Sequence, residues 1–299
     1  MIVYCFKAAF KRYFKKILTS FSKMINVSIV TYLTPIEDVH NVLSICCDSL
    51  VVKNIFVIDN SPDDRLCKAL ISDHKVKYIH NPSNLGYGSA HNIALRESLL
   101  QNIPFHLVLN ADVVFDSKIL EQIVSYANRN KDIGLISPKM LYEDGSVQCS
   151  RKLLPTPFNM FLRAFLPRSF RTQADDKFQL ENLGYDRPLF VPYVSGAFMF
   201  FRTSILEKIG LFDERFFMYP EDIDLSRRVA QVSEVRFAPN FVITHKYGGA
   251  TRKSLRMFVI HFFNMCRYFN KWGWIFDKGR RDLNKFTLEQ KSISKLGKD

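Results

Sequence analysis

The sequence predicts an α/β fold with a Rossmann-like, mainly parallel sheet flanked by helices. Short apolar segments at residues 27–32, 55–59 and 76–80 are typical of buried strands, and helical patterns separate them. Strands that alternate with helices in this way form parallel βαβ units. The chain has 299 residues, of which 47% are hydrophobic, which is enough for one large α/β domain or a domain with an appendage. Ligands of such sheets bind at the carboxyl ends of the strands.

The first two strands end in polar residues, separated by a helix that we expect over residues 36–50. Thr31 and Tyr32 close the first strand, and Asp59 and Asn60 follow the second. Asp59 can accept hydrogen bonds from a nucleobase or a ribose. A polar turn of Asp, Asn and Ser residues explains the same sequence equally well.

A glycine-containing turn follows the third strand. Asn84, Gly86 and Gly88 lie in this turn, and Asn92 follows near the start of the next helix. Two glycines one residue apart let the backbone turn sharply, so the N-terminus of that helix can face a phosphate or a sugar. The spacing is not GxGxxG, and by itself it is a weak signal.

The fourth strand, at residues 105–112, ends in Asn110-Ala111-Asp112. A single Asp after an apolar strand is suited to hold one divalent cation that also binds a diphosphate, because Mg²⁺ usually takes one or two protein carboxylates plus phosphate oxygens. The alternative is that Asp112 caps the helix that we expect over residues 117–130.

The second half of the sequence changes character. Residues 151–192 are rich in Pro, Arg, Leu and Phe, and we expect an irregular, basic and apolar insertion suited to an acceptor that carries a lipid or a diphosphate. Residues 194–202 are typical of a strand, in which Gly196 and Ala197 allow a ligand to approach the backbone. Short strands at residues 235–237 and 241–244 then lead to His245.

Three carboxylates follow an aromatic run at residues 216–219. Pro220 fits the first position of a helix, which places Glu221 and Asp222 in the first turn. Asp224 precedes two arginines, at 227 and 228, at a spacing that permits an ion pair along one face. The segment is explained by a capped surface helix or by a general base held at a helix start.

Basic and aromatic residues alternate at both ends of the chain, and the formal net charge is +13. Residues 1–25 are predicted to form a basic amphipathic helix, and residues 251–299 an aromatic and basic helical segment. Both suit an anionic membrane interface, with packing on the protein core as the alternative. We do not expect a nucleic-acid partner, since no nucleic-acid-binding module accompanies the charge.

The cysteines and the apolar runs limit the class of protein further. The six cysteines show no CxxC spacing, which favours reduced thiols in a cytosolic protein, and no apolar run reaches the ~18 residues that a membrane-spanning helix needs. Between the two ends, we expect two halves, at residues 26–115 and at residues 116–250.

Taken together, these motifs resemble those of the family 2 inverting glycosyltransferases of GT-A fold. They are most similar to the rhamnosyltransferase-like members that build bacterial O-antigen and other surface polysaccharides. The resemblance covers about residues 26–250, and it is carried by the order of Thr31-Tyr32, Asp59-Asn60-Ser61, Asn84 to Gly88 with Asn92, Asn110-Ala111-Asp112, Ser195-Gly196-Ala197-Phe198, Glu221 to Leu225, and His245.

The resemblance implies roles for individual residues. Asp222 would be the catalytic base, Asp112 the last carboxylate of the family's metal-binding DxD motif, and His245 the downstream histidine that completes the metal site. Asp59 would contact the nucleobase, while Ala111 departs mildly from the Asn-Pro-Asp of many rhamnosyltransferase-like members. The other donor-side candidates are Thr31, Tyr32, Asn60, Asn84, Gly86, Gly88, Asn92, Asn110, Gly196 and Ala197, with Glu221 assisting the base and Asp224 supporting it.

The resemblance also implies a function, with residues 26–115 as the nucleotide-sugar-binding half and residues 116–250 as the acceptor-binding and catalytic half. The expected reaction transfers a sugar, with dTDP-rhamnose as the leading donor and a UDP-sugar as the alternative, to a glycan acceptor linked to a lipid diphosphate. The expected cofactor is Mg²⁺ or Mn²⁺, and the expected place is the cytoplasmic face of the inner membrane, with a homodimer left open. A non-catalytic scaffold derived from a transferase is the alternative of another class. A sugar-phosphate nucleotidyltransferase is a further alternative, but it would need a Gly-rich activation loop after residue 32, and the sequence has none there.

Overall fold

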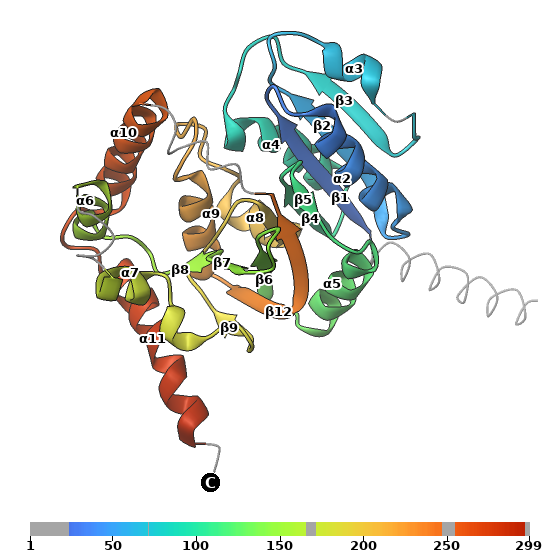
Figure 1. Cartoon of the computed structure of the whole chain (residues 1–299). Coiled ribbons are helices and arrows are strands. Elements are labelled where there is room, and N and C mark those ends of the chain that lie inside the picture. Colours follow the sequence, from blue (N-terminus) through green and yellow to red (C-terminus); the bar gives the residue numbers. More distant parts are fainter. Residues whose placement is uncertain (1–23, 71, 166–171, 247–254, 297–299) are drawn as a thin grey trace, which may run out of the picture.

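The structure is a computed structural model, which describes residues 24–70, 72–165, 172–246 and 255–296. The N-terminal helix predicted for residues 1–25 lies almost entirely outside this range. Figure 1 shows a central sheet with helices on both of its faces, and a group of helices from the second half of the chain beside it. No helix within the described residues is both long and apolar enough to cross a membrane.

The first half of the chain builds a parallel sheet, as predicted. Its strands are β1 (Ile25–Thr31), β2 (Val52–Asp59), β3 (Val76–His80) and β4 (Phe105–Leu109), in the spatial order β3-β2-β1-β4. The helices that connect them are α2 (Ile36–Asp48), α3 (Arg65–Ala69) and α4 (Tyr87–Leu100). β4 and the second half of β2 are nearly continuous apolar runs because the sheet is covered on both faces there.

The second half extends the same sheet with mixed strand directions. β11 (Phe198–Arg202) pairs antiparallel with β4, then β6 (Ile133–Leu141) and β12 (Glu234–His245) follow. β12 is one strand with an irregularity between Ala238 and Val242, where two separate strands were predicted. The short strands are β5 (Val113–Val114), β7 (Val147–Gln148), β8 (Arg151–Lys152), β9 (Leu189–Phe190) and β10 (Tyr193–Val194).

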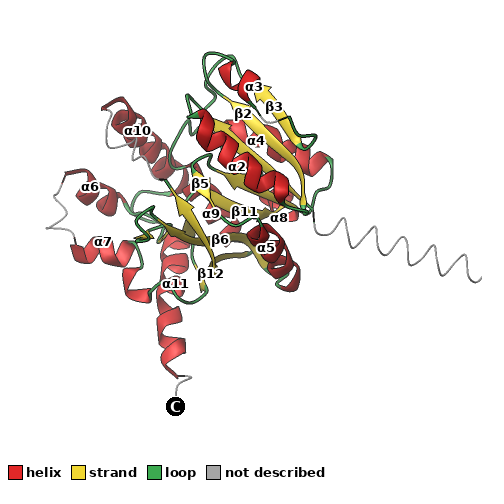
Figure 2. Cartoon of the chain, turned by 45° about the vertical axis from the view of Figure 1, so that its right-hand side comes forward, coloured by secondary structure: helices red, strands yellow, loops and turns green. Residues whose placement is uncertain are grey.

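The two faces of the sheet are covered by different helices (Figure 2). α2 and α5 (Lys118–Arg129) pack with β1 and β4 in one large apolar cluster. On the opposite face, α4, α8 (Thr203–Ile209) and α9 (Glu221–Ala230) form the second cluster with β11 and β12. Because β1 alternates along its length, its apolar side chains face α2 and α5, while Asn26 and Ser28 face polar residues of α4.

The segment predicted as an irregular insertion is instead largely helical. It forms α6 (Pro157–Phe165), α7 (Thr172–Phe178) and a short 3₁₀ helix at Glu181–Leu183. The C-terminal region forms α10 (Leu255–Trp272) and α11 (Lys278–Leu296), which agrees with the predicted helical segment. A further difference concerns Pro220, which lies at the N-cap and not at the first helical position, since α9 begins at Glu221.

Candidate functional site

The site is assembled where β4, β11 and β12 bring their ends together. Leu109 at the end of β4 pairs with Phe198 at the start of β11, so the segments just beyond these two residues are neighbours. The N–H of Asn110 donates to the carbonyl oxygen of Ala197 at 3.0 Å. Antiparallel pairing thus brings the predicted diphosphate-binding segment next to the predicted meeting point of donor and acceptor.

Asp112 and His245 face each other at one side of this junction. His245 ends β12, which pairs with β5 immediately after Asp112, and its Nε2 lies 3.2 Å from Asp112 Oδ1. The side-chain amide of Asn110 lies 3.4 Å from the same Nε2. Gln148 Oε1 lies 2.8 Å from Nδ1, which fixes the ring orientation in the way that outer partners orient a metal-binding histidine. Asp112 remains 31% exposed, so the pair can be reached by a ligand.

Asp222 lies at the other side, in the first turn of α9. Its Oδ2 accepts a hydrogen bond from the N–H of Gly196 at 3.1 Å, and its Oδ1 accepts one from the N–H of Ile223 at 2.8 Å. Burial raises the pKa of Asp222, while these two N–H donors and Lys152 act in the opposite direction. The carboxylate is therefore rigidly placed and more basic than an exposed Asp, which is what a general base requires.

Glu221 precedes Asp222 but has a different environment. Burial, followed by the charge of Asp222, raises the pKa of Glu221 well above its usual range. Its Oε2 is buried without a hydrogen-bond partner among the described residues, whereas both oxygens of Asp222 accept N–H bonds. A proton shared by such a pair is favoured on Glu221, because two N–H donors stabilise the carboxylate form of Asp222.

Tyr87 joins the two sides of the site and was not identified from the sequence as a site residue. Its hydroxyl donates to the carbonyl oxygen of Gly196 at 2.8 Å and lies 3.1 Å from Asn110 Oδ1. Burial, together with the carboxylates of Glu221, Asp222 and Asp112, raises its pKa. The position of this aromatic residue between the two glycines, at the first residue of α4, is the signal that could have identified it.

The predicted nucleobase contact is enclosed by the protein. Asp59 is fully buried; its Oδ1 accepts hydrogen bonds from Thr31 and from the N–H of Ser61, both at 3.0 Å, and its Oδ2 accepts one from Tyr78 at 2.9 Å. Asp59 thus holds the rim of the sheet together, and its contact with a base stays a prediction. Tyr32, by contrast, is exposed at this rim.

The glycine-containing turn packs against the segment before α9 rather than opening toward a ligand. Gly86 adopts a positive φ, and a Cβ placed there would lie 2.1 Å from the carbonyl oxygen of Phe217. The first N–H of α4, that of Tyr87, is bonded to the same oxygen, so it is not free to bind a phosphate. A Cβ on Gly88 would lie 2.9 Å from Phe212. This N–H therefore serves the fold, and the expected contact of this helix start with a phosphate or sugar stays a prediction.

The asparagines of this region also serve the fold. Asn92 is buried and bonds both the N–H and the carbonyl oxygen of Phe212, with its amide also donating to Glu214. Asn60 donates to the carbonyl oxygen of Gly86, and Asn84 accepts from the N–H of Gly86. These side chains fix the turn before α4, and their contact with the donor stays a prediction.

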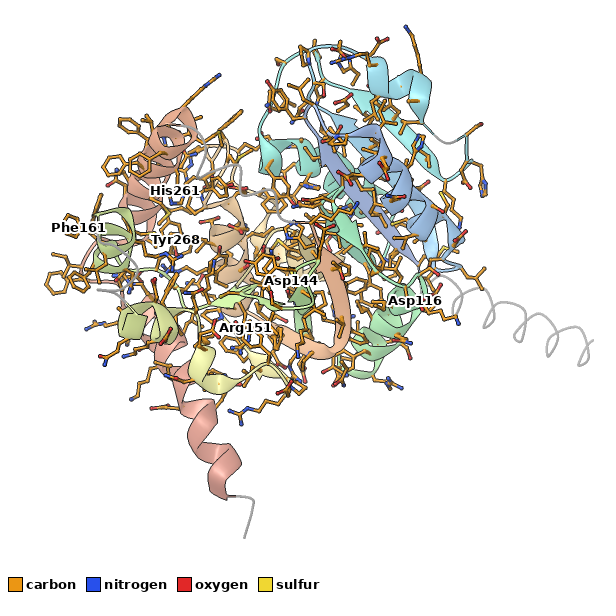
Figure 3. All side chains as sticks on the ribbon, in the orientation of Figure 1. Asp116, Asp144, Arg151, Phe161, His261 and Tyr268 are labelled. Atoms are coloured by element: carbon orange, nitrogen blue, oxygen red, sulfur yellow. The ribbon has the colours of Figure 1, made fainter. Side chains whose placement is uncertain are left out.

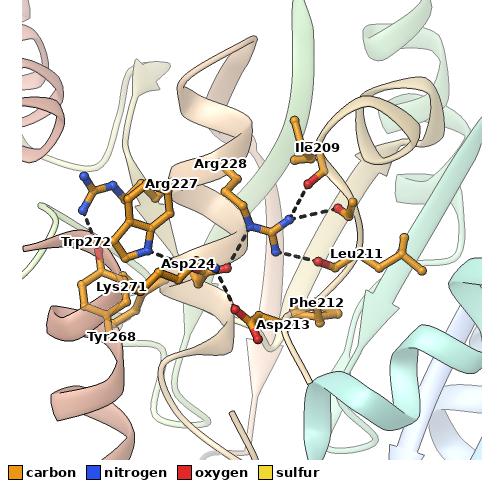
Figure 4. A network of polar contacts seen from close by, with 12 residues as sticks. Ile209, Leu211, Phe212, Asp213, Asp224, Arg227, Arg228, Tyr268, Lys271 and Trp272 are labelled. Atoms are coloured by element: carbon orange, nitrogen blue, oxygen red, sulfur yellow. Dashed lines mark hydrogen bonds and ion pairs between the residues drawn. The ribbon is translucent and has the colours of Figure 1, made fainter. Parts of the chain in front are cut away.

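Asp224 anchors α9, in agreement with its predicted supporting role. It is fully buried and binds Arg228 at 2.8 Å, Lys271 at 2.6 Å and the indole N–H of Trp272 at 2.8 Å. Figure 4 shows how Arg228 in turn donates to the carbonyl oxygens of residues 209–211. The network locks the helix that carries Asp222 between α8 and α10.

Comparison with known proteins gives a family and a set of relatives. The family model described as glycosyl transferase family 2 matches residues 36–210. An N-acetylglucosaminyl-diphospho-decaprenol L-rhamnosyltransferase of Mycobacterium tuberculosis is 28% identical over 212 residues, which cover 66% of this chain and 68% of that protein. The low-salt glycan biosynthesis hexosyltransferase Agl10 of Haloferax volcanii is 28% identical over 207 residues, which cover 68% of this chain and 61% of that protein.

Two solved structures share the fold. The crystal structure of GalNAc-T7 with UDP, GalNAc and Mn²⁺ superposes with a TM-score of 0.54 at 15% identity and covers 75% of this chain and 44% of that one. The mannosyltransferase PcManGT from Pyrobaculum calidifontis, in complex with GDP-Man and Mn²⁺, superposes with a TM-score of 0.52 at 15% identity and covers 81% and 64%. This chain thus spans less than two thirds of both structures and of the Haloferax relative.

Proposed function

Since this chain belongs to glycosyl transferase family 2, we propose that it transfers a sugar from a nucleoside diphosphate donor to a hydroxyl group of a glycan acceptor, with inversion at the anomeric carbon. The family and the glycosyltransferase class predicted from the sequence are confirmed by the family match and by the curated relatives. The predicted GT-A fold is confirmed by its similarity to two solved glycosyltransferases.

The observation that carries the proposed mechanism is the position of Asp222. Its carboxylate is held by the N–H of Gly196, across the junction from Asp112 and His245. In the proposed step, Asp222 accepts the proton of the acceptor hydroxyl while that oxygen forms a bond to the anomeric carbon. The bond between this carbon and the diphosphate oxygen breaks on the opposite side, and the nucleoside diphosphate leaves. Glu221, which carries a proton, does not compete for this role.

The side chains of Asp112 and His245 offer metal-binding atoms that fit a divalent cation. A carboxylate oxygen and an imidazole nitrogen face each other at 3.2 Å, and Gln148 orients the ring from its other nitrogen. Mn²⁺ or Mg²⁺ would be held by these two residues, with diphosphate oxygens as further ligands. A bound cation supplies Lewis-acid stabilisation of the charge that develops on the leaving diphosphate. The two solved structures named above contain Mn²⁺, which supports a divalent cation here as well.

For the substrates, we propose dTDP-rhamnose as the donor and a glycan linked to a lipid diphosphate as the acceptor. The support comes from the Mycobacterium relative, whose name specifies an L-rhamnosyltransferase that acts on a diphospho-decaprenol acceptor. A UDP-sugar is the alternative donor, and the UDP in the GalNAc-T7 structure favours it. We further propose surface polysaccharide synthesis, such as that of O-antigen, at the cytoplasmic face of the inner membrane, to which the chain would attach peripherally.

The decisive experiment combines one variant with one matched control. Asp222→Asn keeps the size of the side chain but removes the base, so we expect transfer to fall at least about 100-fold while nucleotide binding changes less than about tenfold. Glu221→Gln mimics the protonated acid that the structure indicates, so we expect a rate within about fivefold of the unmodified chain. The measurement is the initial rate of transfer from a panel of nucleotide sugars to a lipid-diphosphate-linked acceptor.

Two results would contradict the proposal. Near-normal turnover of Asp222→Asn would show that this carboxylate is not the base, and a loss in Glu221→Gln as large as that in Asp222→Asn would remove the distinction between the two acids. The same assay in excess EDTA examines the cation: we expect transfer to stop and to return on addition of Mn²⁺ or Mg²⁺. Full activity in EDTA would exclude the metal role of Asp112 and His245.

A further inference from the structure

α10 carries an apolar stripe that the rest of the protein covers only in part. Phe258, Phe262, Met265, Phe269 and Trp272 recur at spacings of four, three, four and three residues, so they line one side of the helix. Met265 and Phe269 are buried against residues of α9 and of the segment before it. The first two phenylalanines continue the same stripe but remain exposed. The C-terminal half of the stripe is therefore core, whereas the two phenylalanines of its N-terminal half remain 42 and 49% exposed among the residues that the structure describes.

Apolar side chains of α6 and of neighbouring positions on α10 extend the exposed half of this stripe. α6 packs beside α10, with Met160 in contact with the apolar cluster under α10 (Figures 1 and 2). Figure 3 shows Phe161 at the outer edge of the molecule. We call the exposed surface the α6–α10 face; its six apolar residues are between 42 and 66% exposed, and they are Phe158, Phe161, Phe258, Val259, Phe262 and Phe263.

The charge on this face has one sign. Neither α6 nor α10 contains an Asp or a Glu. Arg256 and Arg267 of α10 are exposed, and the Arg267 guanidinium donates to the backbone oxygen of Arg215 and to the side-chain oxygen of Asn264. Phenylalanines beside arginines, without carboxylates, suit the boundary between anionic headgroups and acyl chains. In a two-fold contact between copies, the same basic residues would face each other, which disfavours a second copy as the occupant.

The α6–α10 face is connected to the start of the catalytic helix. The ring of His261 meets that of Tyr219 edge-on, with 5.3 Å between centroids, and the amide of Asn264 donates to the carbonyl oxygen of Met218 at 2.9 Å. These partners lie two and three residues before Glu221. Because the contacts join α10 to the segment that leads into α9, a ligand that fixes α10 also fixes the position of Asp222.

We propose that the α6–α10 face docks on an anionic lipid bilayer. The six apolar side chains enter the interface, while the arginines of α10 lie among the headgroups. Docking would hold the start of α9 near the membrane and so present Asp222 to an acceptor that is anchored in it. This last consequence rests on the proposed function, whereas docking itself requires no sugar substrate.

The test is flotation of the purified full-length chain with vesicles, without any sugar substrate. We expect binding to vesicles of phosphatidylcholine with phosphatidylglycerol and much weaker binding to phosphatidylcholine alone. Phe262→Ser/Phe263→Ser should lower the partition coefficient at least about tenfold, since two exposed aromatic side chains no longer enter the interface. Phe158→Ser/Phe161→Ser on α6 should act in the same direction, and this second pair decides the question if the first fails to fold.

The matched control is Leu50→Ser/Leu100→Ser. These leucines are 92 and 75% exposed, and they precede β2 and β4, at the opposite edge of the sheet from Asp222. We expect unchanged vesicle binding for this control.

Three results would overturn the proposal. These are no binding to anionic vesicles, equal binding by the Phe variants and the unmodified chain, or a loss of dimer mass in light scattering with lipid binding unchanged. The last result would identify the face as an interface between copies. Intact vesicle binding together with absent sugar transfer would instead contradict only the proposed function.

Discussion

Two glycines near the site differ in what a side chain would meet. At Gly86, a Cβ would lie 2.1 Å from the backbone oxygen of Phe217, and φ is +85°. At Gly196, a Cβ would lie 3.4 Å from Tyr87 and 3.6 Å from Asp222, which are ordinary contact distances. The first glycine is thus required by the fold. The second leaves space between two site residues, which suits the predicted meeting point of donor and acceptor.

We predict opposite effects for alanine at these two positions. Gly86→Ala should lower the free energy of unfolding by at least about 2 kcal/mol, because the backbone conformation is strained for Ala and the methyl group overlaps the Phe217 carbonyl. Gly196→Ala should change it by less than about 0.5 kcal/mol, yet lower kcat/KM for transfer at least about tenfold by displacing a substrate. Urea unfolding and initial rates measure both. A fully active Gly196→Ala would place the reacting groups elsewhere.

At the scale of the element, α9 has a reacting end and an anchoring end. Its first turn presents Asp222, whereas Arg227 near its C-terminus is buried against Asp277, with N–O distances of 2.6 and 2.7 Å. The guanidinium also lies over the ring of Trp272, 3.9 Å from its centroid. Asp277 directly precedes α11, so this ion pair connects the catalytic helix to the two C-terminal helices.

We predict that Asp277→Ala lowers the free energy of unfolding by about 3 to 5 kcal/mol, because Arg227 is left buried without its counter-charge. The double variant Arg227→Met/Asp277→Leu should lose clearly less, since neither charge then remains buried. Urea unfolding of the two variants and of the unmodified chain gives the comparison. A double variant at least as unstable as Asp277→Ala would contradict this account.

At the scale of the whole molecule, a buried polar layer lies between β1 and α4. Ser28 Oγ lies 2.7 Å from His91 Nδ1 and 2.8 Å from His106 Nε2, and Ser98 Oγ lies 2.7 Å from His106 Nδ1. Burial lowers the pKa of His106 to about 3. Burial, together with the nearby His106, lowers the pKa of His91 well below its usual value. Burial therefore favours the neutral form of both rings in the folded protein.

This layer predicts a loss of stability in acid. The unfolded chain protonates these histidines near pH 6.5, whereas in the folded protein the pKa of His106 is lowered to about 3 and that of His91 is lowered well below its usual value. The free energy of unfolding therefore falls as pH drops below about 6.5, by up to about 1.4 kcal/mol per pH unit for each ring. His106→Gln should show a shallower slope between pH 6.5 and 4.5, while exposed His74→Gln should keep the original slope. Equal slopes for His106→Gln and the unmodified chain would show that His106 is not buried in its neutral form.

The sequence predicted some elements and missed others for identifiable reasons. β1 to β4 were found because each is an apolar run between polar turns. β6 was not predicted, since Gly134 and Pro138 argue against a central strand. In the structure, Pro138 pairs with Ala238 at the irregularity of β12, where the missing N–H is tolerated. The same irregularity, which contains Pro239, explains why β12 was predicted as two strands.

The sequence by itself determined the family, the order of the parallel strands and the identity of the polar residues at their ends. It could do so because strands, turns and helix starts are encoded by local patterns of burial and backbone preference. Only the tertiary structure decided which of these residues meet one another. Asp112 meets His245, and Asp222 meets Gly196, because strand pairing and the anchoring of α9 bring distant segments together. Asp59 and Asn92 turn inward for the same reason: their hydrogen-bond partners come from segments whose proximity no local pattern records.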